Sequence, residues 1–271
     1  MKAPHSLLLA ATLLAAPAAA QDMADSVVDK STKRAYPIHL QAGTTDQIHT
    51  LVGIGVRTRT MLNIKVYAVG LYIDQEPAKV ALADWAGKEP KELEKNKAMF
   101  QRMLEMDMGM TLRLIMTRDV GGEKMAEAFE KALAPRVEKA AAEMNMADGT
   151  DALAAFRGYF GVDKVTDDSE LIFSCVDGTL YTTIKSEVAE DIESPALCWA
   201  LFDVYIGEKP ISKGAKKNIG KGMAAVLASA PSDEAGDDDD DVDDSDDEND
   251  DDDGDDHENE DQDDDDGNPG S

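Results

Sequence analysis

The sequence predicts an α+β protein in which an antiparallel sheet carries a layer of helices on one side. Two runs rich in Val, Ile and Thr, residues 48–61 and 64–73, read as strands, and the short link between them favours antiparallel pairing. Two further runs of strand composition, residues 171–176 and 179–186, flank Asp177-Gly178, the strongest hairpin signal in the chain. Because helical segments lie between these groups of strands, the pattern is typical of the α+β class.

The helical segments are indicated by their composition and by proline. Residues 77–85 and 90–106 each begin at a proline, which suits the first helical turn because an amide hydrogen has no partner there. Gly121-Gly122 interrupts the chain before a long stretch rich in Ala, Glu and Lys. The remaining predicted elements are strands over 36–40 and 110–117 and helices over 123–144, 150–160, 195–205 and 212–228.

Residues 1–20 have the pattern of a signal peptide. Lys2 is followed by an uncharged apolar run over 7–16, and Ala18-Ala19-Ala20 supplies the small side chains of a cleavage site. A membrane anchor is the competing interpretation, but the run is shorter than the roughly 20 residues that cross a bilayer and is followed by Pro17. We therefore expect a protein of the secretory pathway, exported to an extracellular or periplasmic location, with a plastid reached by the secretory route as a further destination. No later segment is apolar enough for a transmembrane helix.

Residues 230–271 form a polyacidic tail that we expect to be disordered. They contain 25 Asp and Glu and no Lys or Arg, so the net charge of −29 for the whole chain becomes −4 without them. Like charges at this density repel one another and leave no apolar surface to bury. The densest block is Asp237, Asp238, Asp239, Asp240 and Asp241. The expected roles are diffuse binding of divalent cations, docking of a basic partner or simple solubilisation; nucleic acid is disfavoured because its phosphates would be repelled.

Between these ends we expect an N-terminal linker over 21–35 and a single domain over 36–229, which is long enough for one sizeable core. Cys175 and Cys198 form either one disulfide or two buried thiols, and both alternatives stay open. The four histidines are isolated in the sequence, so no defined metal site and no cofactor are predicted.

Three segments of this domain together resemble chalcone isomerase and the fatty-acid-binding proteins that share its fold. Residues 53–60 read GIGVRTRT and are followed at 65–72 by KVYAVGLY. Near the end of the domain, residues 200–212 read ALFDVYIGEKPIS, and residues 112–119 precede two glycines and a long helix in the order that the family shows. The resemblance implies an open-faced β-sandwich, an antiparallel sheet with a helical layer, and a cleft for a small, mostly apolar molecule.

The resemblance also indicates which site residues are kept. The isomerases polarise their substrate with an arginine that corresponds to Arg57, which is retained. Their threonine on the next strand falls at Tyr67, a second threonine falls at Val204, and a tyrosine expected near Lys124 or Met125 is missing. Ring closure requires positioned donors for a developing enolate, so these losses disfavour catalysis. An arginine with a tyrosine on the adjacent strand resembles the non-catalytic branch, in which this pair holds a fatty acid carboxylate.

The leading hypothesis is therefore a non-catalytic protein that binds a fatty acid or similar small amphipathic carboxylate through Arg57 and Tyr67, with Arg59 as the alternative or auxiliary cation. One alternative is an intramolecular lyase of the isomerase type with Arg57 as its catalytic residue. Another is a cation- or mineral-associated protein that works through its acidic tail. Without the resemblance, Arg57 reads as a structural ion pair, Tyr67 as a core aromatic, and Arg113 and Arg118 as surface residues.

Overall fold

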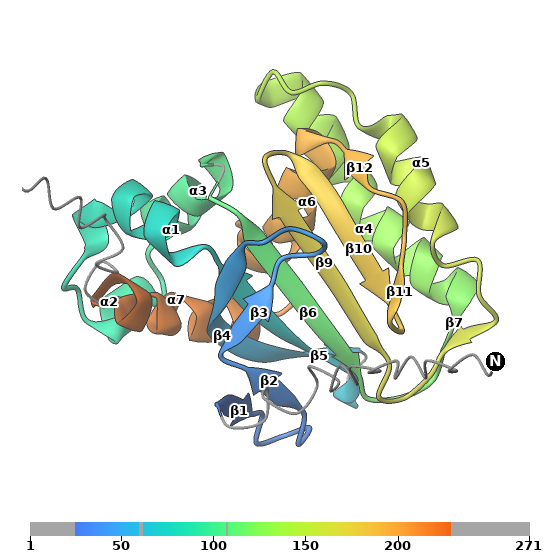
Figure 1. Ribbon diagram of the computed structural model, residues 1–271, viewed down its shortest axis with the longest axis horizontal. Coiled ribbons are helices and arrows are strands. Elements are labelled where there is room, and N and C mark those ends of the chain that lie inside the picture. Colours follow the sequence, from blue (N-terminus) through green and yellow to red (C-terminus); the bar gives the residue numbers. More distant parts are fainter. Residues whose placement is uncertain (1–24, 60–61, 107, 229–271) are drawn as a thin grey trace, which may run out of the picture. The chain divides into compact units, whose positions relative to one another are not determined.

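The computed structural model describes residues 25–59, 62–106 and 108–228, and its fold confirms the predicted α+β class (Figure 1). The main sheet is antiparallel, with the strand order β11-β10-β9-β6-β5-β4-β3, and β12 pairs with the beginning of β10. Its strands are β3 (His39–Gln41), β4 (Ile48–Arg59), β5 (Ile64–Ile73), β6 (Met110–Met116), β9 (Glu170–Val176), β10 (Thr179–Ile184), β11 (Glu187–Val188) and β12 (Ile192–Glu193). The signal peptide at 1–20 and the tail at 230–271, including Asp237–Asp241, lie outside the described residues.

The two predicted hairpins are confirmed. β4 pairs with β5 in a register that sets Arg57 opposite Tyr67. β9 pairs with β10 through Asp177 and Gly178, whose φ angles of 50° and 74° are the positive values that a tight two-residue turn requires. Alternation along β5 sends Tyr67, Val69 and Leu71 into the main core.

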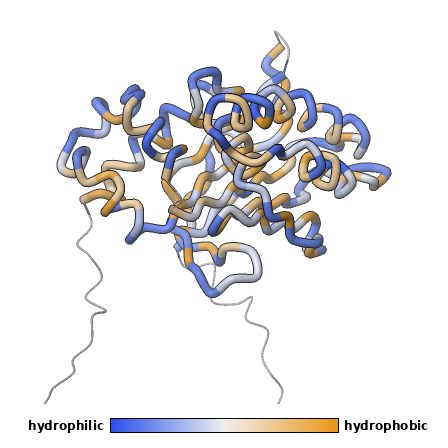
Figure 2. Tube along the Cα trace, turned by 90° about the horizontal axis from the view of Figure 1, so that it is seen from above, coloured by the Kyte–Doolittle hydropathy of each residue, from blue (hydrophilic) through white to orange (hydrophobic). Residues whose placement is uncertain are grey.

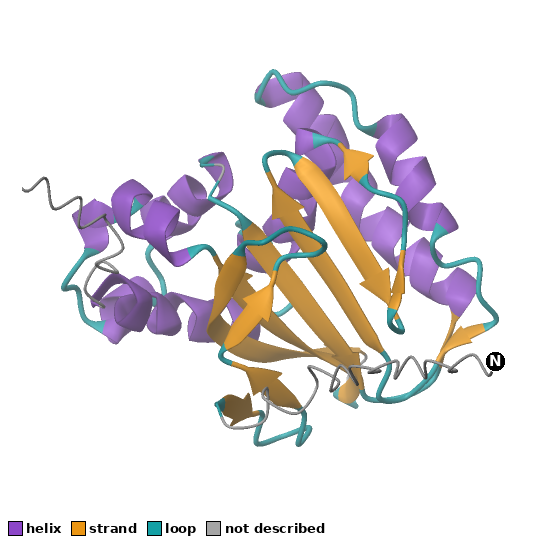
Figure 3. Cartoon of the chain, viewed as in Figure 1, coloured by secondary structure: helices purple, strands orange, loops and turns teal. Residues whose placement is uncertain are grey.

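Helices cover one face of the sheet (Figure 3). They are α1 (Gln75–Ala81), the 3₁₀ turn η2 (Ala83–Trp85), α2 (Pro90–Leu93), α3 (Lys97–Glu105), α4 (Gly122–Glu143), α5 (Thr150–Gly158), α6 (Pro195–Ile206) and α7 (Lys213–Ala228). In Figure 1, α4, α5 and α6 lie behind β6, β9 and β10, and α4 packs against both other helices. Figure 2 shows apolar segments running through the interior of the domain and polar ones along its outer helices. Within the described ranges, no helix combines the length and apolar character needed to cross a bilayer.

The single helix predicted over 90–106 is wrong, because the chain forms α2 and α3 with a break between them. Asn96 has an extended backbone conformation, and its side chain accepts a hydrogen bond from the amide of Met99 at 2.9 Å. An asparagine in this role starts a new helix, since it satisfies an amide that the first turn leaves without a partner. The methionines around this break, Met99 and Met103 among them, pack in the main core.

The predicted linker over 21–35 is too long. β1 (Ser26–Val28) pairs with β2 (Ala35–Pro37), and the turn between them is held by Asp29, whose carboxylate accepts hydrogen bonds from Thr32. Arg34 forms an ion pair with Asp167 at 2.6 Å and donates to the carbonyl of Met116. These contacts anchor the segment, and so the ordered domain begins before residue 36.

A small second core lies on the sheet face away from the helices. It contains Tyr36, Ala68, Tyr72 and Ile115, all buried. Tyr36 comes from β2, so the N-terminal segment covers part of a face that would otherwise be open. A separate short pair, β7 (Val120–Gly121) with β8 (Lys164–Val165), leads into α4.

The glycines of β4 allow α7 to lie directly on the strand. A Cβ atom added at Gly55 would come within 2.3 Å of the Cβ of Ala215, and one at Gly53 within 2.8 Å of the backbone of Ile219. Hydrogen bonds then fix the helix in place: Ser212 Oγ donates to the carbonyl of Val56 at 3.0 Å and caps the first turn of α7. The glycine-rich strand is thus explained by close packing as well as by the arginine that it carries.

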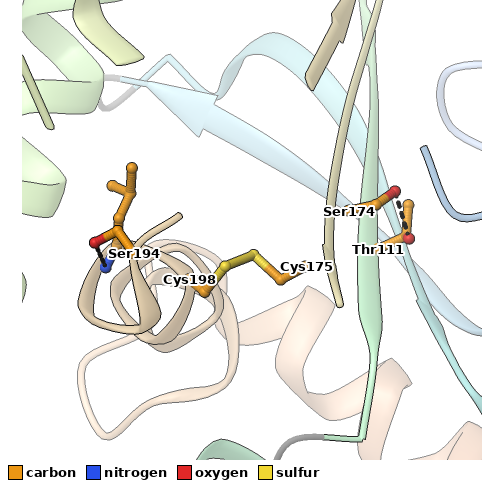
Figure 4. The surroundings of a disulfide bond; sticks show 6 residues. Thr111, Ser174, Cys175, Ser194 and Cys198 are labelled. Atoms are coloured by element: carbon orange, nitrogen blue, oxygen red, sulfur yellow. Dashed lines mark hydrogen bonds between the residues drawn. A yellow bond between two sulfur atoms is a disulfide. The ribbon is translucent and has the colours of Figure 1, made fainter. Parts of the chain in front are cut away.

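Cys175 and Cys198 form a disulfide, which decides between the two alternatives left open by the sequence (Figure 4). The bond joins β9 to α6, with a Cα–Cα distance of 5.8 Å. In Figure 4, Cys175 points toward α6, whereas its neighbour Ser174 points to the opposite side of β9 and meets Thr111. Ser194 caps α6 by accepting a hydrogen bond from the amide of Leu197.

Candidate functional site

A cavity of about 570 Å³ opens between the sheet and the helical layer. Its walls come from the ends of β4 and β5, the segment after β6, one face of α4, the end of α6, and Ile211. A volume of this size falls in the range of roughly 300 to 1,000 Å³ that small-molecule sites occupy in proteins. The cavity is therefore the candidate ligand site of the described domain.

Arg57 lines this cavity from β4. The side chain is half-buried, and Nη1 donates to the carbonyl of Ile211 at 2.8 Å. Among the residues that the structure describes, no carboxylate forms an ion pair with Arg57. A partly buried charge without a counterion is costly, so this guanidinium is a strong candidate for binding an anion.

Two tyrosine hydroxyls lie beside this cation. Tyr67 from β5 and Tyr205 from α6 both line the cavity, are both buried, and have their hydroxyl oxygens 2.8 Å apart. One hydroxyl must donate to the other, which leaves a single proton of the pair available to a ligand. Burial raises the pKa of both hydroxyls, and the charge of Arg57 acts in the opposite direction on both. The pair is therefore protonated near neutral pH and acts as a donor.

The rest of the inner wall is apolar. α4 presents Met125, Phe129 and Ala132 at helical spacing, and α6 adds Val204. Phe129 stacks on Phe160 with ring centroids 5.1 Å apart, so the wall is backed by a packed aromatic group. Such a surface suits a hydrocarbon chain or a flat apolar ring.

Arg136 also lines the cavity, but its charge is already used. Its Nε donates to Asp203 at 2.7 Å, and its Nη2 donates to the carbonyl of Lys209 at 3.0 Å. The pair joins α4 to α6 and to the turn that follows α6. Arg136 therefore positions the wall of the cavity and is not available as an anion-binding group.

The structure brings the three predicted site residues together. Arg57, Arg59 and Tyr67 all line the same cavity, although their role in binding stays a prediction. Arg118, expected at the surface, lines it too. Arg113 does not: it forms an ion pair with Glu170 on the other face of the sheet.

Tyr205 is the site residue that sequence reasoning missed. Val204, its neighbour, was matched to the isomerase threonine, and both residues line the cavity. The available signal was a tyrosine on a helix that is buried along most of its length, since a buried tyrosine hydroxyl usually requires a partner.

A cleft with an inner arginine, paired tyrosine hydroxyls and an apolar wall, placed between an antiparallel sheet and its helices, defines a small-molecule-binding protein of the α+β class. More specifically, the chain belongs to the chalcone isomerase-like family: residues 47–220 match the family described as "Chalcone isomerase like". This confirms the resemblance found in the sequence.

Individual relatives include both binding proteins and enzymes. The chain is 28% identical over 202 residues to Fatty-acid-binding protein 1 of Arabidopsis thaliana, covering 72% of this chain and 69% of that protein. It is 29% identical to Chalcone isomerase-like protein 1 of Humulus lupulus, covering 74% and 92%, and 30% identical to a chalcone–flavanone isomerase of Oryza sativa subsp. japonica, covering 66% and 81%. A crystal structure of an Arabidopsis thaliana fatty-acid binding protein superposes with a TM-score of 0.62 at 27% identity, covering 75% of this chain and 99% of that one.

Proposed function

We propose that this protein binds a fatty acid or a similar small amphipathic carboxylate in the cavity beside Arg57, without catalysing a reaction on it. The observation that carries the proposal is the half-buried Arg57, without an ion-pair partner in the described domain, next to the buried hydroxyls of Tyr67 and Tyr205.

The chemistry of these groups suits a carboxylate. Arg57 uses one N–H on the carbonyl of Ile211, and its remaining donors can reach two carboxylate oxygens in a charge-assisted fork. The free proton of the tyrosine pair adds a third hydrogen bond. The apolar face of α4, with Met125 and Phe129, then accommodates the hydrocarbon part.

The side chains at two family positions favour binding over isomerisation. By the resemblance, Val204 and Tyr67 stand where the isomerases have threonines, so the donors of that reaction are altered. Burial raises the pKa of the Tyr67 and Tyr205 hydroxyls, so they stay protonated near neutral pH and can donate to a bound carboxylate. Relatives named as fatty-acid-binding proteins, one of them with a solved structure of the same fold, support this choice.

The proposal includes export of the protein. The signal-peptide pattern of residues 1–20 motivates it, and the disulfide between Cys175 and Cys198 supports it, because disulfides persist mainly in oxidising compartments. Secretion of the full chain from its native host, followed by N-terminal sequencing that begins at Gln21, is the expected result. A mature protein that retains Met1 inside the cell would overturn this part.

The ligand is tested by organic extraction of purified protein and mass spectrometry. Wild type should carry stoichiometric acyl carboxylate, and Arg57→Gln should carry little. Arg102→Gln is the matched control, because Arg102 is exposed on α3 and does not line the cavity. Equal occupancy in wild type and Arg57→Gln contradicts the proposal, as does saturable, Arg57-dependent cyclisation of a chalcone.

A further inference from the structure

The cavity has more cations around it than a single carboxylate needs. Besides Arg57, its lining includes Arg59 and Arg118 from the ends of β4 and the β6 segment and Lys124 and Lys131 from α4. No ion pair joins any of these five to a carboxylate within the described residues.

The lining of the cavity contains few carboxylates to balance these cations. Asp119 is the one carboxylate in the lining, and it is already held by Lys164 at 2.7 Å and by the amide of Asp167 at 2.9 Å. The chain outside its acidic tail has a net charge of −4, so a cationic background does not explain the cluster. Like charges gathered around a concave site repel one another, and a bound anion would relieve that repulsion.

The cations fall into an inner and an outer set. Arg57 is half-buried and opposite Tyr67 in the sheet, whereas Arg59 is exposed and opposite Ile64, two residues or about 7 Å further along the strand. Arg118 lies at the same end of the sheet, because the residue before it donates its amide to Val66. All four outer cations are exposed.

α4 contributes two of the outer cations, and they lie on one face of the helix. Lys124 and Lys131 are seven residues apart, which places them on one face of the helix, two turns from each other. The adjacent face carries Met125 and Phe129 into the cavity. The helix thus separates an apolar inner wall from a cationic outer edge.

We infer that the preferred ligand carries a second anionic group, a phosphate or a further carboxylate, held by Arg59, Arg118, Lys124 and Lys131. The inference rests on the proposed function, since the first carboxylate or acyl oxygen is bound by Arg57 and the tyrosine pair. Phosphate and carboxylate share the chemistry that these donors recognise, and arginine forks suit both.

A competing role for the outer cations is electrostatic steering alone. Steering raises the association rate of any anionic ligand and leaves the dissociation rate unchanged, whereas direct contact with a second group slows dissociation. The two roles therefore differ in a measurable quantity.

The test is calorimetric titration and stopped-flow kinetics of the full, delipidated chain with three probes: dodecanoate, dodecanedioate and 12-(phosphonooxy)dodecanoate, of which the last two carry a second anionic group. The inference predicts that at least one doubly charged probe binds about tenfold more tightly than dodecanoate, through slower dissociation. The preferred probe identifies the second group as carboxylate or phosphate. In the double variant Arg118→Gln/Lys124→Gln this ratio should fall to about one.

The control is a double variant of equal charge change outside the cavity, Lys91→Gln/Arg102→Gln, in which the ratio should persist. If dodecanoate binds in an Arg57-dependent way and both doubly charged probes bind no more tightly, the inference is overturned while the proposed function stands. If no probe binds, the proposed function fails and the inference fails with it.

Discussion

The hydroxyl oxygens of Tyr67 and Tyr205 lie 2.8 Å apart, although 138 residues separate them in the chain. This hydrogen bond joins β5 of the sheet to α6 of the helical layer at the inner end of the cavity. β5 carries Tyr67 opposite Arg57, and α6 lines the cavity, so this hydrogen bond stabilises the fold and also lies in the ligand site.

Removal of one hydroxyl should weaken both ligand binding and stability. Tyr205→Phe leaves Tyr67 with a buried hydroxyl without its partner, which should lower the free energy of unfolding by about 1 to 3 kcal/mol. Affinity for dodecanoate should fall about 2- to 10-fold, because the Tyr67 hydroxyl keeps its proton for the ligand but loses the hydrogen bond that orients it. Urea unfolding and calorimetric titration measure the two effects.

A double variant separates the effect of the hydrogen bond between Tyr67 and Tyr205 from the effects of the single substitutions. In Tyr67→Phe/Tyr205→Phe no buried hydroxyl is left unpaired, so its loss of stability should be smaller than the sum of the single variants. Additive losses would show that the two hydroxyls do not interact.

The disulfide between β9 and α6 should contribute measurably to stability. It closes a loop with a sequence separation of 23, for which the chain-entropy relation gives about 3 kcal/mol. Addition of reductant should lower the thermal midpoint of wild type and leave Cys175→Ala/Cys198→Ala unaffected. A midpoint for wild type that does not respond to reductant under unfolding conditions would contradict the assignment.

The packing of α7 on β4 should make Gly55 intolerant of any side chain. Gly55→Ala places a Cβ atom 2.3 Å from that of Ala215, so the helix must move and stability should fall by more than about 2 kcal/mol. Gly214→Ala is the control, because Gly214 lies on α7, the helix that packs on β4, and no atom lies within 4 Å of its added Cβ. That variant should be neutral or stabilised by up to about 1 kcal/mol. The two thermal midpoints, compared with wild type, check the prediction.

His49 should make stability depend on pH. The ring is fully buried on the sheet face away from the helices, and burial lowers its pKa from 6.5 to about 4. Between pH 6.5 and pH 4 the unfolded chain binds a proton on His49 and the folded chain does not. The contribution of the neutral, buried ring to the free energy of unfolding is therefore complete above pH 6.5 and is lost as the pH falls toward 4. When the pH has fallen below both pKa values, His49 has lowered the free energy of unfolding by about 3 kcal/mol.

The measurement is the free energy of unfolding at several pH values for wild type and His49→Gln. The variant should lose less stability than wild type between pH 7 and pH 4. His39→Gln is the control, because that ring is exposed on β3. Parallel curves for wild type and His49→Gln would contradict the prediction.

Local signals allowed much of the fold to be predicted. The β4–β5 and β9–β10 hairpins join neighbours in sequence, and the placement of Arg57 and Tyr67 on adjacent strands followed from the first of them. The three-residue strand β1 was missed because its order depends on distant contacts, such as that of Arg34 with Asp167. The same holds for Tyr205, whose place beside Tyr67 is set by how α6 packs on the sheet. Side chains from adjacent strands could thus be predicted, and those brought by a distant helix could not.

Calorimetric titration of delipidated protein with dodecanoate measures whether Arg57 binds the carboxylate of an amphipathic ligand in the cavity. We expect one saturable site in wild type, at least about a tenfold loss of affinity in Arg57→Gln, and unchanged affinity in Arg102→Gln. Equal affinity in wild type and Arg57→Gln, or no binding to wild type, would contradict this role of Arg57.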